Sequence, residues 1–168
     1  HRHRIEHFEI PDDELMDRAY NLGITLGMQP AFDHYWGYED YARYLGPERA
    51  LRKNPFRSIL DKGLVVGGGS DCFVTPISPL LGIHSCLNHS VATSRIGLNE
   101  ALSMFTMGCA YIGFEEKTKG SIKVGKQADL AILSEDIYKT PKESIKDMKV
   151  MGTIHKGNFV WKDPDSPW

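Results

Sequence analysis

Apolar residues along the first half of the chain recur in segments that predict strands followed by helices. Leu15, Ala19 and Leu22 recur at helical spacing, and they indicate a helix over residues 11–23 that begins with Pro11 and ends at Gly23. Short apolar runs before and after this helix have strand character. Three strands are predicted in all, at residues 4–7 (RIEH), 24–30 (ITLGMQP) and 64–71 (LVVGGGSD). Strands that alternate with helices in this way predict an α/β fold with a parallel sheet.

The connections between these strands differ in character. Residues 31–45 are rich in aromatic rings and are predicted to be irregular, with helix from about Glu39. Such an insertion either shapes a substrate site or covers the core or a neighbouring subunit, and both interpretations stay open. Helices are expected at residues 55–63, 78–91 and 98–113, the last with apolar residues at i, i+3, i+4 and i+7.

The sequence pattern changes after Gly113, where glycines separate short segments in which apolar and polar residues alternate. A β-hairpin is expected near the C-terminus, with its turn at residues 156–158. We therefore divide the chain near residue 117, into an α/β part (1–116) and a β-rich part (117–168).

Composition excludes several classes of protein. Of the 168 residues, 41% are hydrophobic and 25% are charged, and the net charge is −2 with neutral histidines, as in ordinary globular proteins. The absence of a basic run argues against nucleic acid, and no apolar run has the length of a membrane span. The three cysteines form no CxxC pair, which favours reduced thiols and a cytoplasmic location.

Two residues stand where predicted strands end, and both are types that bind metals. His7 ends the first strand and Asp71 ends the third. The carboxyl ends of parallel strands meet at one mouth of a barrel, and imidazole with carboxylate suits a divalent metal such as zinc. On spacing alone, a structural histidine and an ordinary turn aspartate are the commoner alternatives.

A succession of motifs adds to this interpretation. RIEH, QP, LGPER, GLVVGGGSDCFVTPISPLLGI and GSIKVGKQADLAIL together resemble the C-terminal part of metal-dependent amidohydrolases. The similarity is greatest to the amidohydrolase-3 group, which includes enzymes like N-substituted formamide deformylase and D-aminoacylase. The resemblance implies a (β/α)8 TIM barrel with a small composite β-sandwich, of which this chain supplies barrel strands six to eight and part of the sandwich.

The resemblance also implies roles for site residues. His7 matches the metal-binding histidine after strand six, and Asp71 matches the strand-eight aspartate, which binds metal and acts as general base. The implied cofactor is one or two divalent ions, with zinc expected. The weaker candidates for substrate contact are Gln29, His34 and Arg49, whereas His84 and His89 are expected to be structural or exposed.

By this resemblance the first five barrel strands lie upstream of His1, together with the other metal ligands. His1-Arg2-His3 is not the family's HxH pair, because no apolar strand precedes it. We therefore expect a C-terminal fragment that is inactive alone and that leaves both edges of its sheet unpaired.

The function expected of the parent protein is metal-dependent hydrolysis of non-peptide C–N bonds in a small-molecule amide. Two alternatives stay open: a non-catalytic or regulatory relative, and a deaminase or cyclic amidase of the same superfamily. No nucleic-acid or membrane partner is expected, and a homo-oligomer is left open.

Overall fold

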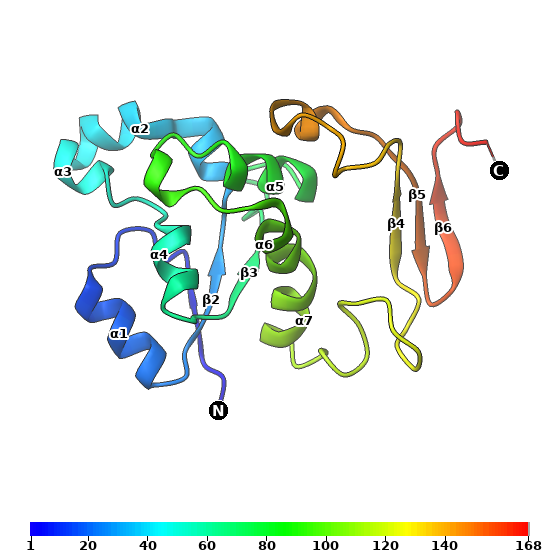
Figure 1. The fold of residues 1–168 in the computed structure, drawn as a ribbon, viewed down its shortest axis with the longest axis horizontal. Helices are drawn as coiled ribbons and strands as arrows, with labels where there is room; N and C mark the ends of the chain where they lie inside the picture. Colours follow the sequence, from blue (N-terminus) through cyan, green and yellow to red (C-terminus); the bar gives the residue numbers. More distant parts are fainter. Residues whose placement is uncertain (168) are drawn as a thin grey trace.

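The computed structural model describes residues 1–167 as two small sheets with helices packed around and between them (Figure 1). The first sheet is parallel, with the order β1-β2-β3, and the second is antiparallel, with the order β4-β5-β6. No helix in the described part of the chain is long and apolar enough to cross a membrane. The strands are β1 (Arg4–Glu6), β2 (Thr25–Met28), β3 (Val66–Gly68), β4 (Leu130–Leu133), β5 (Val150–His155) and β6 (Asn158–Lys162).

The parallel sheet confirms the predicted α/β fold. Ile5 pairs with Leu26, and Leu26 pairs with Val66, so all three strands run in the same direction. Each strand is shorter than predicted: β2 ends before Gln29, and β3 covers only three residues. The residues that follow each strand turn away from the sheet at one end, and this end carries the candidate site.

Most helices begin where the sequence predicts. In α1 the Asp12 side chain accepts a hydrogen bond from the Leu15 backbone N–H, which caps the helix. The helix over 98–113 contains a π-helical segment in its middle. The helical elements are α1 (Asp13–Asn21), α2 (Ala31–Leu45), α3 (Pro47–Ala50), α4 (Phe56–Asp61), α5 (Pro79–Leu87), η1 (Ala92–Ser94), α6 (Leu98–Ser103), η2 (Met104–Gly108), α7 (Cys109–Ile112) and η3 (Lys142–Asp147).

The prediction that residues 31–45 are irregular as far as Glu39 is wrong. Helix α2 begins at Ala31, and its regular backbone is interrupted only at Gly37, where φ is 51°. The first turn is helical because Ala31 and Phe32 are buried in the interior. The aromatic composition of the segment gives no indication that this first turn is buried.

Among the described residues, both β1 and β3 are edge strands without a further strand beside them, as expected, but the free edge of β3 is covered. Segment η2 and helix α7 lie along it, and the Cys109 thiol donates a hydrogen bond to the Gly68 carbonyl at 3.3 Å. Gly108 approaches so closely that a Cβ atom there would lie 2.0 Å from the Val66 carbonyl oxygen. One edge of the sheet is therefore shielded by a helix of the same chain.

The β-rich C-terminal region forms the expected hairpin. Strands β5 and β6 are antiparallel, with His155 paired to Asn158 across a turn in which Lys156 and Gly157 both have positive φ. Ile145 and Met148, although they follow residue 117, belong to the same apolar core as the residues of β2 and α4. The division of the chain near residue 117 stays a prediction.

Candidate functional site

His7 lies at the carboxyl end of β1, in a turn that directs its ring toward the end of β2. Its backbone has φ of 68°, and its N–H donates to the Gly27 carbonyl at 2.8 Å. Its ring atom Nδ1 lies 2.9 Å from Oε1 of Gln29. The ring also stacks on Phe32, with centroids 6.0 Å apart and an angle of 20° between the planes. The backbone of His7 is therefore held by β2, and its ring by the segment that follows β2.

The loop after His7 is held by residues from distant segments. The Asn54 backbone N–H donates to the Glu9 carbonyl at 2.6 Å, and the Tyr41 hydroxyl hydrogen-bonds to the Glu9 carboxylate. Burial, followed by this contact with Glu9, raises the pKa of Tyr41 above its ordinary value, so the phenol keeps its proton. The two contacts fix the loop two residues beyond His7.

Asp71 lies after β3, at the same end of the sheet, and its side chain is exposed. The backbone turns sharply here: Asp71 has φ of 50°, and its carbonyl accepts a hydrogen bond from the Val74 N–H at 2.6 Å. The Thr75 hydroxyl closes the turn by donating to the Ser70 carbonyl. Among residues 1–167, no hydrogen bond or ion pair joins the side chains of His7 and Asp71, and no group of three or more His, Cys, Asp or Glu side chains could hold a metal.

Gln29 lies between these two positions and is 6% exposed. Its Nε2 donates to the Gly27 carbonyl at 3.4 Å, while Oε1 faces His7. A Cβ atom at Gly69 of the following strand end would lie 4.0 Å from the same Nε2. The structure thus brings together His7 and Gln29 among the predicted site residues.

His34 and Arg49 lie elsewhere. His34 is exposed on α2, and its ring packs edge-on against His84 of α5, with centroids 5.6 Å apart. Arg49 is exposed on α3, and its guanidinium has no hydrogen bond or ion pair with the rest of the described chain. Their predicted contact with substrate stays a prediction.

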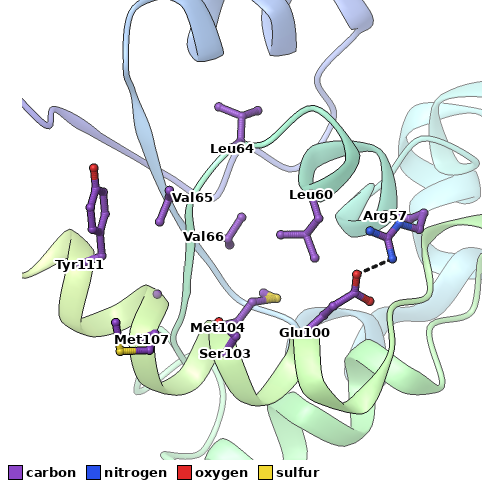
Figure 2. A pocket seen from close by; sticks show the side chains of 11 residues that line it. Arg57, Leu60, Leu64, Val65, Val66, Glu100, Ser103, Met104, Met107 and Tyr111 are labelled. Carbon is purple, nitrogen blue, oxygen red and sulfur yellow. Dashed lines mark hydrogen bonds and ion pairs between the residues drawn. The ribbon is translucent and has the colours of Figure 1, made fainter. Parts of the chain in front are cut away.

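Two cavities flank β3. A small one, about 170 Å³, lies at its carboxyl end and is bounded by Gly69, Ser70 and the Phe105 ring among others. The larger one, about 390 Å³, is shown in Figure 2, and its apolar wall includes Leu64 and Val66. The Arg57–Glu100 ion pair stands at one side of it, with 2.7 Å between Nη1 and Oε1. Because Leu64 precedes β3, this cavity reaches the amino end of the strand, opposite the end that carries Asp71.

A buried polar cluster near α2 was missed by the sequence analysis. Asp33 accepts hydrogen bonds from the Ser90 N–H at 2.8 Å and the Ser90 hydroxyl at 2.7 Å, and it forms an ion pair with Lys53. Nε2 of His89 lies 3.5 Å from the same carboxylate. Burial alone would raise the pKa of Asp33, but His89, Lys53 and Ser90 together hold it below its usual range. No sequence motif unites these residues, which come from three separate segments.

Comparison with known proteins identifies the family of this chain. The model of the Amidohydrolase family called Amidohydro_3 matches residues 1–161. The chain belongs to this family. It is 30% identical over 95% of its length to a Bacillus subtilis protein named "Putative amidohydrolase YtcJ", of which it covers 32%. It is 27% identical over 92% of its length to the N-substituted formamide deformylase of Arthrobacter pascens, of which it covers 30%. The chain therefore spans about a third of these Amidohydrolase-family relatives.

Solved structures show the same fold. An uncharacterized metal-dependent hydrolase from Pyrococcus furiosus superposes with a TM-score of 0.65 at 26% identity, over 74% of this chain and 26% of that one. An adenosine deaminase from Xanthomonas campestris with bound zinc gives a TM-score of 0.71 at 14% identity, over 93% and 36% of the two chains. In both comparisons the shared fold covers only part of the larger solved structure.

Proposed function

We propose that the polypeptide carrying this chain is a metal-dependent hydrolase of non-peptide amide bonds in small molecules. The observation that carries this proposal is the family match over residues 1–161, together with His7 and Asp71 after strands of one parallel sheet. In this proposal β1, β2 and β3 are strands six to eight of a (β/α)8 barrel, and β4–β6 belong to a small β-sandwich.

The side chains fit a divalent cation in type, because imidazole and carboxylate are both common zinc ligands. Nδ1 of His7 is engaged by Gln29, which leaves the other ring nitrogen for a ligand. Zinc is the cation we expect. When bound, such an ion polarises the substrate carbonyl and lowers the pKa of water.

In the proposed reaction, His7 and Asp71 hold the cation and Asp71 also moves the proton. The Asp71 carboxylate accepts a proton from the attacking water and donates it to the nitrogen that leaves. Its exposed position at the end of β3 leaves it open to solvent water and substrate. Because two protein ligands are fewer than the three of a typical catalytic zinc site, residues 1–168 alone are expected to be inactive.

The replacement Asp71→Asn tests the role of this carboxylate in the complete polypeptide. The amide cannot take a proton from water, so hydrolysis of N-formyl and N-acyl amines should fall by at least about a hundredfold, within the range general bases contribute. The control is Asp165→Asn, an exposed residue of the C-terminal tail, which should leave turnover unchanged. Near-normal turnover in Asp71→Asn would contradict the proposal, and an inactive wild-type protein would favour the non-catalytic alternative.

A second candidate is a deaminase or cyclic amidase. The chain is 36% identical over 70% of its length to a Bos taurus protein named "Probable imidazolonepropionase". Ring-containing C–N substrates therefore belong in the same assay. Turnover of these compounds without turnover of open-chain amides would favour this candidate.

A further inference from the structure

We propose that Gln29 is a positioning residue, which fixes the protonated nitrogen of His7 as Nδ1 so that Nε2 presents its lone pair at the carboxyl end of the sheet. The use of that lone pair for a metal rests on the proposed function. The position of the proton on the His7 ring does not rest on the proposed function, because it follows from contacts within the chain.

The first step is the orientation of the Gln29 amide. One end of this amide lies 3.4 Å from the Gly27 carbonyl oxygen, which can only accept a hydrogen bond. The Gly27 carbonyl is held in place, because it also accepts the His7 backbone N–H at 2.8 Å. The NH₂ group of Gln29 must therefore face Gly27, and the amide oxygen Oε1 must face the His7 ring.

The second step is the proton on His7. Oε1 of Gln29 only accepts hydrogen bonds, and it lies 2.9 Å from Nδ1. Nδ1 must therefore carry the hydrogen. A neutral imidazole has one N–H, so Nε2 is left with a free lone pair, the form in which a histidine binds a metal.

The third step is the restraint on rotation of the His7 ring. Phe32 is 7% exposed and stacks on this ring, and Phe32 is itself held edge-on by Trp36, with centroids 5.1 Å apart. A ring turned over by 180° would still stack on Phe32, but it would lose the contact between Nδ1 and Oε1 of Gln29. Outer hydrogen bonds of this kind orient metal-binding histidines, and their loss typically weakens metal binding by about 10–100-fold.

These contacts also assign a different role to Gln29 from substrate binding. Both ends of its amide are already engaged by His7 and Gly27. A substrate group could use Gln29 only by displacing one of them. Positioning is the role that its contacts favour.

The test is the tautomer of His7 in the complete, metal-free polypeptide. Long-range ¹H–¹⁵N spectra of protein labelled at histidine nitrogens distinguish Nδ1–H from Nε2–H under alkaline conditions, in which imidazoles are neutral. The His7 signal, identified by its loss in His7→Phe, should report Nδ1–H. An Nε2–H signal in the wild-type protein would overturn the proposal without recourse to any variant.

Three variants sharpen this test. Gln29→Met has a similar length without an acceptor oxygen, so His7 should lose its Nδ1–H preference, whereas Gln29→Glu keeps an acceptor and should restore it. The control is Gln127→Met. The Gln127 side chain contacts Asp129 in the C-terminal region, so its replacement should leave the His7 signal unchanged. An unchanged tautomer in Gln29→Met would overturn the proposal.

Zinc titration separates this inference from the proposed function. Gln29→Met should bind zinc about 10–100-fold more weakly than the wild type, and Gln29→Glu should recover the affinity. Equal affinities for wild type and Gln29→Met would contradict the positioning role. Suppose that His7 carries its proton on Nδ1 in the wild type, but that neither the wild type nor any variant binds zinc. The proposed metal-dependent function then fails, while the role of Gln29 in fixing the ring stands.

Discussion

Lys53 and Asp33 form an ion pair in the protein interior, where the lysine side chain has no solvent exposure and the aspartate side chain 5%. Burial lowers the pKa of Lys53, and its contact with Asp33 acts against this shift. The pair joins the first turn of α2 to the segment between α3 and α4, and Ser90 extends it to the loop after α5. The ion pair and the Ser90 hydrogen bonds therefore connect three segments that are distant in sequence, beside the end of β2.

Removing one partner of this pair should destabilise the protein strongly. Lys53→Met leaves the Asp33 carboxylate buried without its cation, so we expect a loss of about 3–5 kcal/mol in the free energy of unfolding. Urea denaturation followed by circular dichroism measures this loss. The matched control is Lys62→Met, which breaks an exposed pair with Asp17 and should cost less than about 1 kcal/mol. Equal losses in the two variants would show that the buried pair contributes no more to stability than the exposed pair does.

His89 should make stability depend on pH. Burial lowers its pKa to about 4, below the ordinary value of about 6.5 that it regains on unfolding. Between these values the unfolded state binds a proton that the folded state does not. Stability should therefore fall as the pH drops from about 6.5 to about 4, by on the order of 3 kcal/mol.

The variant His89→Gln isolates this contribution. It lacks the titrating ring, so the decline between about pH 6.5 and pH 4 should become shallower than in the wild type. Asp33 does not obscure this difference, because its pKa is lowered on folding. Its contribution to stability is therefore lost only as the pH falls below the unfolded value of about 3.9. Identical pH profiles for wild type and variant, measured by urea denaturation, would rule out His89 as the source.

Gly108 should be intolerant of any side chain. An added Cβ would lie 2.0 Å from the Val66 carbonyl oxygen, and this contact is with backbone that cannot move without disturbing β3. We expect Gly108→Ala to cost about 1–3 kcal/mol despite the better helix propensity of alanine. In contrast, a Cβ at Gly69 meets nothing closer than 4.0 Å, so Gly69→Ala should change stability by less than about 0.5 kcal/mol. Thermal unfolding of both variants provides the comparison.

The sequence pattern predicts the elements that rest on local signals. Helix α1 follows from its apolar spacing between Pro11 and Gly23, and the β5–β6 hairpin follows from the turn at residues 156–158. The placement of His7 and Asp71 at one end of the sheet follows from parallel strands, whose carboxyl ends lie on one side.

Features that depend on contacts distant in sequence could not be predicted in this way. Helix α2 begins at Ala31 because its first turn is buried, and the aromatic composition of the segment does not show that burial. The Lys53–Asp33 pair joins positions 20 residues apart, so no helical or strand periodicity indicates it. Likewise, the contact of Gln29 with His7 appears only when β1 and β2 are paired in register.

Anomalous diffraction at the zinc edge, from crystals of the complete polypeptide loaded with zinc, is the direct test of the proposed metal site. We expect a zinc peak about 2.0–2.2 Å from both Nε2 of His7 and a carboxylate oxygen of Asp71. A zinc peak bound to neither residue, or no peak at the carboxyl ends of β1 and β3, would contradict the proposed metal site and the hydrolysis that depends on it.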